Sequence, residues 1–146
     1  MAPKISVVIP VFNNRLNEVQ NAIASVIAQT HQNFEIIVVN DCSDDNGQTI
    51  ADVNGCIAKY PAHTISLITH DNNQGVSAAR NTGIKKVSGE FIATLDSDDI
   101  WHPEKLAAQL QAIEQSGDRE NTICLCDYDS VPKNGQGVVI QNRPSY

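Results

Sequence analysis

The sequence has no long hydrophobic run and no excess of basic residues, and each absence excludes a class of protein. No apolar stretch approaches the ~20 residues that a membrane-spanning helix requires. The 146 residues include 10 Lys and Arg against 17 Asp and Glu, a net charge of −7. Because nucleic acids and anionic membranes bind clustered basic residues, we expect no such partner. We therefore expect one soluble domain without a transmembrane segment.

The sequence also lacks paired cysteine motifs and clustered histidines. The cysteines are Cys42, Cys56, Cys124 and Cys126. They do not have the C-x-x-C spacing of a zinc site, and no secretory signal precedes them, so reduced thiols in a cytoplasmic protein are the simplest interpretation. The histidines are His31, His63, His70 and His102. Their spacing builds no ligand set, and we expect no specific role for them.

Glycine-rich phosphate motifs are absent as well. No GxGxxG follows the first predicted strand, and no GxxxxGK[ST] occurs anywhere. Neither a dinucleotide fold nor a P-loop is therefore predicted. A phosphate-bearing ligand would have to be bound through a metal ion and not through a nest of glycine amides.

Apolar runs alternate with helical periodicities along the chain. The runs predict strands over residues 5–9, 34–39, 64–69, 90–95 and 122–128, of which the first, the second and the fourth are expected to be buried. Residues 131–141 predict a turn with a short returning strand. Pro10 is expected at the end of the first strand, because proline cannot donate to a ladder. Strand–helix alternation of this kind predicts an α/β fold with a mostly parallel sheet and right-handed crossovers.

The helices are predicted between these strands. Asn17 and Gln20 form a plausible capping pair for a helix that ends near residue 27. The apolar positions of the following helices are Ile50, Val53 and Ile57, then Val76, Ala79, Gly83 and Val87, and last Leu106, Leu110 and Ile113 after Pro103 in the first turn. The small residues of the second set would let that helix lie close to the sheet.

Three polar segments follow predicted strands, at residues 10–13, 40–45 and 96–99. Ligands of parallel sheets bind beyond the carboxyl ends of the strands, so we expect these segments to converge there. The last segment places three carboxylates in four residues, which repel one another by up to ~4 kcal/mol per close pair at an effective dielectric near 20. A hard divalent cation such as Mg²⁺ or Mn²⁺, shared with substrate phosphates, would relieve that repulsion.

Four ordered segments carry a resemblance to a known family. Residues 6–13, 38–43, 73–81 and 95–99 together resemble the family 2 glycosyltransferases, and the resemblance covers nearly the whole chain. It implies a single Rossmann-like GT-A domain over residues 1–146 that binds a nucleotide-diphospho-sugar. It also implies a metal-assisted, inverting transfer of the sugar to an acceptor hydroxyl, with a UDP-sugar as the expected donor.

The resemblance also implies roles for individual residues at the nucleoside end of the site. By position, Pro10 and Phe12 would border the base, and Asp41 would accept a hydrogen bond from the base ring. Asn72 or Asn73 would contact the nucleotide.

At the phosphate end, Arg80 would contact nucleotide or phosphate. Asp96 would lie beside the ribose and the metal, as the first acid of a DXD motif. Asp98 would ligate the metal, which the resemblance implies to be Mn²⁺ or Mg²⁺.

The chain departs from the family pattern in two ways. Residues 40–42 read Asn, Asp, Cys where the family usually has two acids and a small residue, although the second acid is retained. The general base of the family lies in a later segment, so the acceptor-binding half is expected to be largely absent and the chain to be a truncated, donor-binding part. No catalytic base is predicted, since Asp127 and Asp129 precede that segment and are interpreted as solvated acids.

Three functions remain open at this point. The first is a glycosyltransferase of cell-surface glycan synthesis with a glycan or lipid-linked acceptor, in the cytoplasm or brought to the inner face of the membrane by missing segments or partners. The second is a non-catalytic nucleotide-sugar-binding fragment or module. The third is a phosphatase or phosphotransferase in which Asp96 attacks phosphorus. Two observations oppose the third function. The Asp-x-Asp motif at residues 96–98 follows the fourth predicted strand and not the first, and Ile100 occupies a position where such an enzyme would have a hydroxyl residue.

Overall fold

The computed structural model describes residues 2–15 and 17–126. Its elements in chain order are β1 (Ile5–Val11), α1 (Glu18–Ile27), β2 (Phe34–Asn40), α2 (Gln48–Lys59), β3 (Thr64–Thr69), α3 (Val76–Ile84), β4 (Phe91–Thr94) and α4 (Lys105–Ser116). The chain divides into two compact units, residues 1–107 and 108–146. The first unit holds every strand in the described residues.

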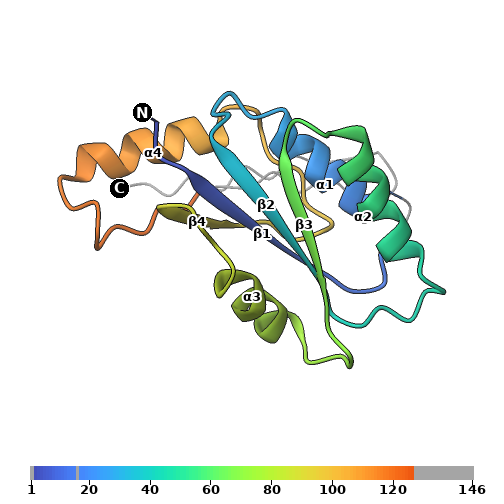
Figure 1. The fold of residues 1–146 in the computed structure, drawn as a ribbon. Coiled ribbons are helices and arrows are strands. Elements are labelled where there is room, and N and C mark those ends of the chain that lie inside the picture. Colours follow the sequence, from blue (N-terminus) through green and yellow to red (C-terminus); the bar gives the residue numbers. More distant parts are fainter. Residues whose placement is uncertain (1, 16, 127–146) are drawn as a thin grey trace, which may run out of the picture. The chain divides into compact units, whose positions relative to one another are not determined.

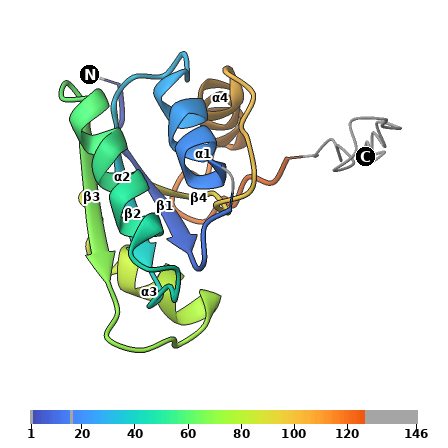
Figure 2. The ribbon, with the colours of Figure 1, turned by 90° about the vertical axis from the view of Figure 1, so that its right-hand side faces the viewer.

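The first unit is built on a parallel sheet with the strand order β3-β2-β1-β4. Figures 1 and 2 show α1 and α2 side by side on one face of the sheet and α3 on the opposite face. The predicted α/β fold with a mostly parallel sheet is therefore confirmed. From β1 to β3, each new strand is added on the same side of the sheet, but β4 is added on the other side of β1. The carboxyl ends of β2, β1 and β4 therefore lie next to one another.

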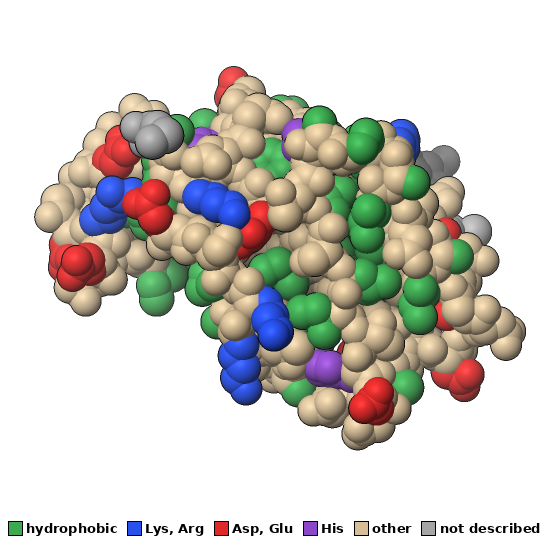
Figure 3. All heavy atoms as spheres, viewed as in Figure 1, with side chains coloured by type: hydrophobic (Ala, Val, Ile, Leu, Met, Phe, Trp, Pro, Cys, Tyr) green, Lys and Arg blue, Asp and Glu red, His purple; other side chains and the backbone are tan. Residues whose placement is uncertain are grey.

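The two central strands are buried along their whole length, and the edge strands are not. Every residue of β1 and β2 is buried, whereas exposed and half-buried residues mix along β3 and alternate along β4. In Figure 3, hydrophobic side chains remain visible at the surface over β2 and β3 beside α3. The apolar runs at residues 5–9 and 34–39 thus correspond to strands covered on both faces. The expectation of a buried strand over residues 90–95 is wrong, because β4 is an edge strand of half-buried and exposed residues.

The first strand continues past its predicted end. β1 includes Pro10, which pairs with Val39 of β2. The ladder to β4 ends at the pair of Val8 and Thr94, so no ladder bond is required from the nitrogen of Pro10 on that side. A proline is tolerated here because the neighbouring strand has already stopped.

The predicted cap of α1 is wrong. Asn17 adopts the left-handed conformation and makes no side-chain cap hydrogen bond. Asn14 takes that role instead, since its Oδ1 accepts the Val19 N–H at 2.9 Å. The Nε2 of Gln20 donates to Oδ1 of Asn17 at 3.4 Å, a contact between side chains only.

The buried side of α2 also differs from the prediction. Its buried residues are Thr49, Val53 and Cys56, while Ile50 is 37% exposed. The predicted set, Ile50, Val53 and Ile57, and the observed set each have the spacing of one helical face. Periodicity alone therefore could not distinguish them. The polar contacts of Thr49 decide the face, because its hydroxyl accepts the N–H of Asn14 at 3.0 Å.

The close approach of α3 to the sheet is confirmed. Ala79 packs with Ile37 and Val39, and Val87, just beyond the helix, joins the same cluster. A Cβ on Gly83 would lie 2.4 Å from Cγ1 of Val8. Only a residue without a side chain fits at this position.

We expect the substitution Gly83→Ala to lower the free energy of unfolding by about 1–3 kcal/mol, because the added methyl group overpacks the sheet surface. Gly55→Ala is the matched control. Gly55 also lies inside a helix, but nothing stands within 4 Å of its Cβ position, so alanine there should stabilise by about 0.5–1 kcal/mol. Urea unfolding of both variants measures the difference, and equal effects would contradict the packing argument.

Of the elements predicted after residue 100, only the helix is confirmed. Leu106, Leu110 and Ile113 of α4 are buried as expected, but the helix begins at Lys105, two residues after Pro103. The described portion of the predicted strand 122–128, residues 122–126, contains no strand. Residues 127–146, which include the predicted 131–141 hairpin, lie outside the described residues. In the described part of the chain no helix is long and apolar enough to cross a membrane.

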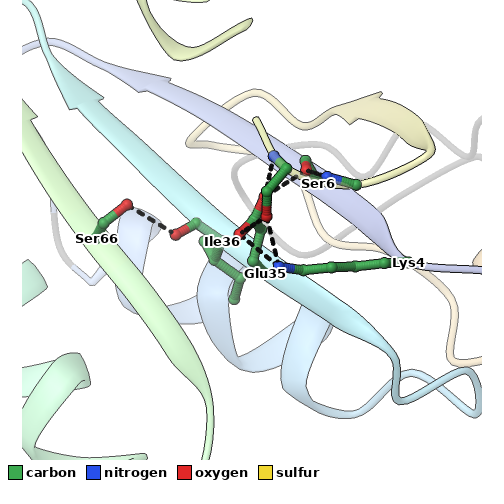
Figure 4. A network of polar contacts seen from close by, with 7 residues as sticks. Lys4, Ser6, Glu35, Ile36 and Ser66 are labelled. Carbon is green, nitrogen blue, oxygen red and sulfur yellow. Dashed lines mark hydrogen bonds and ion pairs between the residues drawn. The ribbon is translucent and has the colours of Figure 1, made fainter. Parts of the chain in front are cut away.

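A buried carboxylate joins three segments at the amino end of the sheet, the end opposite to the polar loops. Glu35 accepts hydrogen bonds from Lys4 Nζ at 2.8 Å, Ser6 Oγ at 2.6 Å and the Ser88 backbone N–H at 2.7 Å (Figure 4). Burial by itself disfavours the charged form, but these hydrogen bonds outweigh burial and lower the pKa of Glu35 to about 2. The carboxylate is therefore ionised at neutral pH and ties β1, β2 and the segment before β4 together.

Candidate functional site

A pocket of about 430 Å³ opens at the carboxyl ends of β1, β2 and β4. Its lining comes from four segments of the first unit, namely Pro10, Val11 and Phe12, then Asp41, then Asn73, Gly75, Val76 and Ala79, and last Asp96, Ser97 and Asp98. The three polar segments predicted to converge are thus brought together. The segment from residue 73 to 79, which leads into α3, forms another wall of the pocket.

Asp41 is the most highly connected acid of the pocket. Oδ1 accepts the Gln74 N–H at 2.9 Å, and Oδ2 accepts the Gly75 N–H at 2.7 Å. Its side chain is almost fully buried. Burial would raise the pKa of Asp41, but the hydrogen bonds from Gln74, His70 and Gly75 together hold it below its usual value. A charged Asp41 therefore fixes the loop that leads into α3.

His70 has a role that its scattered position in the sequence did not reveal. Its Nδ1 lies 2.7 Å from Oδ1 of Asp41, and its Nε2 lies 2.9 Å from Oγ1 of Thr82 on α3. The imidazole thereby links the buried acid to the helix. The expectation that the histidines have no specific role is wrong for His70. Its location directly after β3, at the same edge as the other polar loops, was the available signal.

The two asparagines proposed for nucleotide contact are placed differently. Asn73 lines the pocket, and its Nδ2 donates to the backbone oxygen of Asp41 at 3.3 Å. Asn72, one residue earlier, is exposed and is not among the lining residues. The structure therefore favours Asn73 over Asn72 as a residue of the site.

The loops after β1 and β2 support each other beside the pocket. Oδ1 of Asn40 accepts the N–H of Ser43 at 3.0 Å, and Ser43 Oγ in turn accepts the N–H of Asn13 at 2.8 Å. Asn40 is buried, so its amide serves this loop contact and not the pocket. The adjacent ring of Phe12 is half exposed and lines the pocket with Pro10.

At the other end of the pocket, a guanidinium group contacts the acid motif. Arg80 of α3 forms an ion pair with Oδ1 of Asp96. The Nε of Arg80 is buried and, among the described residues, has no hydrogen-bond partner. A buried N–H donor without a partner is costly. Arg80 is not among the residues that line the pocket, so its link to the site is the ion pair with Asp96.

The remaining acids of the motif differ in their surroundings. Asp98 lines the pocket with Asp96, whereas Asp99 does not. Burial, followed by the charges of Asp98 and Asp96, raises the pKa of Asp99. This direction agrees with the mutual repulsion that the sequence predicts for three neighbouring carboxylates.

The donor set fits a divalent cation that completes its coordination with ligand oxygens. Within the described residues, no three His, Cys, Asp or Glu side chains form a ready metal-binding cluster. Asp96 and Asp98 nevertheless offer two carboxylates to one pocket. Mg²⁺ is commonly held by one or two carboxylates together with substrate phosphates, so two protein ligands suffice when a diphosphate is bound.

A parallel sheet with a pocket of apolar and acidic side chains at its carboxyl edge defines an α/β ligand-binding domain. The sequence matches the model of Glycosyl transferase family 2 over residues 6–137. The chain belongs to this family, and the resemblance seen in the sequence is confirmed.

Relatives of known sequence agree with this assignment. A glycosyltransferase of Rickettsia bellii, described as uncharacterized, is 43% identical over 113 residues, which are 77% of this chain and 15% of that protein. The UDP-Glc:alpha-D-GlcNAc-diphosphoundecaprenol beta-1,3-glucosyltransferase WfgD of Escherichia coli is 37% identical over 106 residues, 73% of this chain and 39% of that enzyme. The chain thus spans less than half the length of these relatives.

Solved structures show the same fold. S. aureus TarS in complex with UDP-GlcNAc is 29% identical with a TM-score of 0.65, covering 77% of this chain and 31% of that one. The mannosyltransferase PcManGT from Pyrobaculum calidifontis, in complex with GDP-Man and Mn²⁺, has a TM-score of 0.70 at 23% identity, covering 76% and 32%. The fold is therefore GT-A, represented here by about a third of the length of those chains.

Proposed function

We propose that this chain is the donor-binding part of an inverting, metal-assisted glycosyltransferase that acts in cell-surface glycan synthesis. The observation that carries the proposal is that one pocket holds both Asp41, at the end of β2, and the pair Asp96 and Asp98, after β4 on the other side of β1. A nucleoside diphosphate has a neutral base at one end and charged phosphates at the other. The buried anchor at Asp41 and the acid pair correspond to these two ends.

In this proposal the pocket residues divide the work of binding. Pro10 and Phe12 supply apolar surface for the base, and Asp41 and Asn73 fix the loop beside it. Arg80, whose guanidinium group pairs with Asp96, supplies positive charge at the phosphate end. The donor is a UDP-sugar, because TarS binds UDP-GlcNAc and the name of WfgD specifies UDP-Glc.

The charge of the pocket argues for a cation. Asp41, Asp96 and Asp98 would repel a diphosphate, and Arg80 offers only one positive charge against them. Asp96 and Asp98 would hold Mn²⁺ or Mg²⁺. Such an ion, when bound, supplies Lewis-acid stabilisation of the charge that develops on the leaving diphosphate. The complex of PcManGT with Mn²⁺ supports this assignment.

The experiment is thermal unfolding with UDP and Mn²⁺. A ligand at about 100 times its Kd adds about 2.7 kcal/mol to the free energy of unfolding, so we expect a clear rise in Tm with both ligands and a smaller one with UDP alone. Asp98→Asn should remove the effect of Mn²⁺ and retain the effect of UDP. The absence of any shift with UDP, GDP or other nucleotides would reject the proposal.

A non-catalytic binding fragment is the second candidate. The acids that line the pocket in the described residues are Asp41, Asp96 and Asp98, and each already has a binding role in the proposal. A general base must reach the acceptor hydroxyl from a separate position. Release of UDP from UDP-sugars with a broad acceptor mixture distinguishes the two, since transfer by this chain would reject the fragment.

A further inference from the structure

Two polar side chains are buried at the end of α1, on an otherwise apolar side. The buried apolar residues of the helix are Val19, Ala22, Ile23 and Val26. Ser25 lies among them, and Gln29 follows the helix with only 2% of its surface exposed. Burying an amide is unfavourable unless its donors and acceptors are bonded. The partners of these side chains therefore indicate what they do.

Two of the three backbone groups that the Gln29 side chain bonds lie more than 70 positions further along the chain. Its Nε2 donates to the backbone oxygen of His102 at 2.8 Å and to that of Ser25 at 3.1 Å. Its Oε1 accepts the Leu106 N–H at 3.0 Å, a group in the first turn of α4. The Gln29 side chain thus bonds both the first turn of α4 and the segment that precedes α4.

Two neighbouring contacts hold the same segment. Ser25 Oγ accepts the Trp101 N–H at 3.1 Å, and the Thr30 N–H donates to the backbone oxygen of Pro103 at 2.8 Å. Together with Gln29, the end of α1 fixes residues 101–106 through their main chain. We call these contacts the α1 clamp.

The α1 clamp begins two residues after the acid motif. On the other side of the motif, the Leu95 N–H donates to the backbone oxygen of Val8 at 3.0 Å, and the Leu95 side chain is fully buried. The five residues 96–100 are therefore held at both ends, by the sheet and by the clamp. A loop that is ordered before the ligand arrives does not lose conformational entropy when it binds.

We propose that Gln29, assisted by Ser25, is a positioning residue for the acid motif. It holds the motif so that Asp96 and Asp98 offer their carboxylates together to a divalent cation, which the diphosphate would also bind. This inference rests on the proposed function. Groups that orient metal ligands from outside the coordination shell typically change metal affinity by 10–100-fold when removed.

The test measures the Kd of UDP by calorimetry with and without Mn²⁺. In Gln29→Leu, we expect the gain in UDP affinity that Mn²⁺ provides to fall by about tenfold or more, while the Kd without metal stays within about twofold. Ser25→Ala removes the Trp101 contact and the hydrogen bond that Ser25 Oγ donates to the Ala22 backbone oxygen at 2.7 Å, but it leaves the Gln29 contacts in place and should cause a smaller loss of the same kind. It also serves if the leucine variant does not fold. Thr30→Val is the control, because it retains the N–H that donates to Pro103 at 2.8 Å and loses only the longer, 3.4 Å contact of the exposed hydroxyl with the same oxygen; it should match the parent chain.

The outcomes separate this inference from the proposed function. If the parent chain binds UDP no better with Mn²⁺ than without it, the proposed metal-assisted function fails. If Mn²⁺ improves binding in the parent chain and equally in both clamp variants, the positioning role is wrong. An equal loss with and without Mn²⁺ would also overturn it, because Gln29 would then support the fold alone.

Discussion

Replacing Asp41 with alanine is expected to abolish measurable nucleotide binding and to lower the free energy of unfolding by about 3–5 kcal/mol, the cost of breaking a buried charged contact. The carboxylate accepts hydrogen bonds from the backbone N–H groups of Gln74 and Gly75 and lies 2.7 Å from Nδ1 of His70. Alanine leaves these groups without an acceptor. The loop that forms one wall of the pocket then loses its attachment to β2.

The measurement combines urea unfolding with calorimetric titration of UDP and Mn²⁺. Asp44→Ala is the matched control. Asp44 is an exposed acid of the loop after β2, in which Asp41 also lies, and its removal should change the free energy of unfolding by no more than about 0.5 kcal/mol. Asp41→Asn keeps one oxygen acceptor and should lie between alanine and the parent chain. Full nucleotide affinity in Asp41→Ala would contradict the role of this residue.

The sheet was predictable because its evidence lies within short segments of the sequence. Continuous apolar runs predict strands covered on both faces, and the runs at residues 5–9 and 34–39 correspond to the buried strands β1 and β2. The convergence of residues 10–13, 40–45 and 96–99 followed from parallel topology alone. The pocket at that edge contains Pro10 and Phe12 beside the acid pair.

Details that depend on partners distant in sequence could not be predicted. The face of α2 is set by a hydrogen bond between Asn14 and Thr49, and the cap of α1 comes from Asn14 instead of Asn17. Asn14 caps a helix only five residues away, but Thr49 and Asp52 of α2 hold it in place. Periodicity and cap rules use only neighbouring residues, so both failed where these contacts decided. His70 and Gln29 show the same limit, because each becomes informative only once its buried partners are known.

Glu35→Gln is expected to lower the free energy of unfolding by about 3 kcal/mol at pH 7. The pKa of Glu35 is lowered from 4.5 to about 2 in the folded chain, and each unit of difference corresponds to about 1.4 kcal/mol. Because the folded pKa lies below the unfolded one, this stabilisation is fully present above about pH 5. It is lost as the pH falls from there towards 2.

The sign of this dependence makes the test specific. Glutamine resembles the protonated acid, so the parent chain and Glu35→Gln should differ most near neutral pH and converge as the pH approaches 2 and below. Urea unfolding across this range measures the difference at each pH. Glu114→Gln removes an exposed acid and should follow the parent chain throughout, to within about 0.5 kcal/mol. A Glu35→Gln effect that stays constant with pH would mean that shape, and not the charge held by Lys4, Ser6 and Ser88, accounts for the contribution of Glu35.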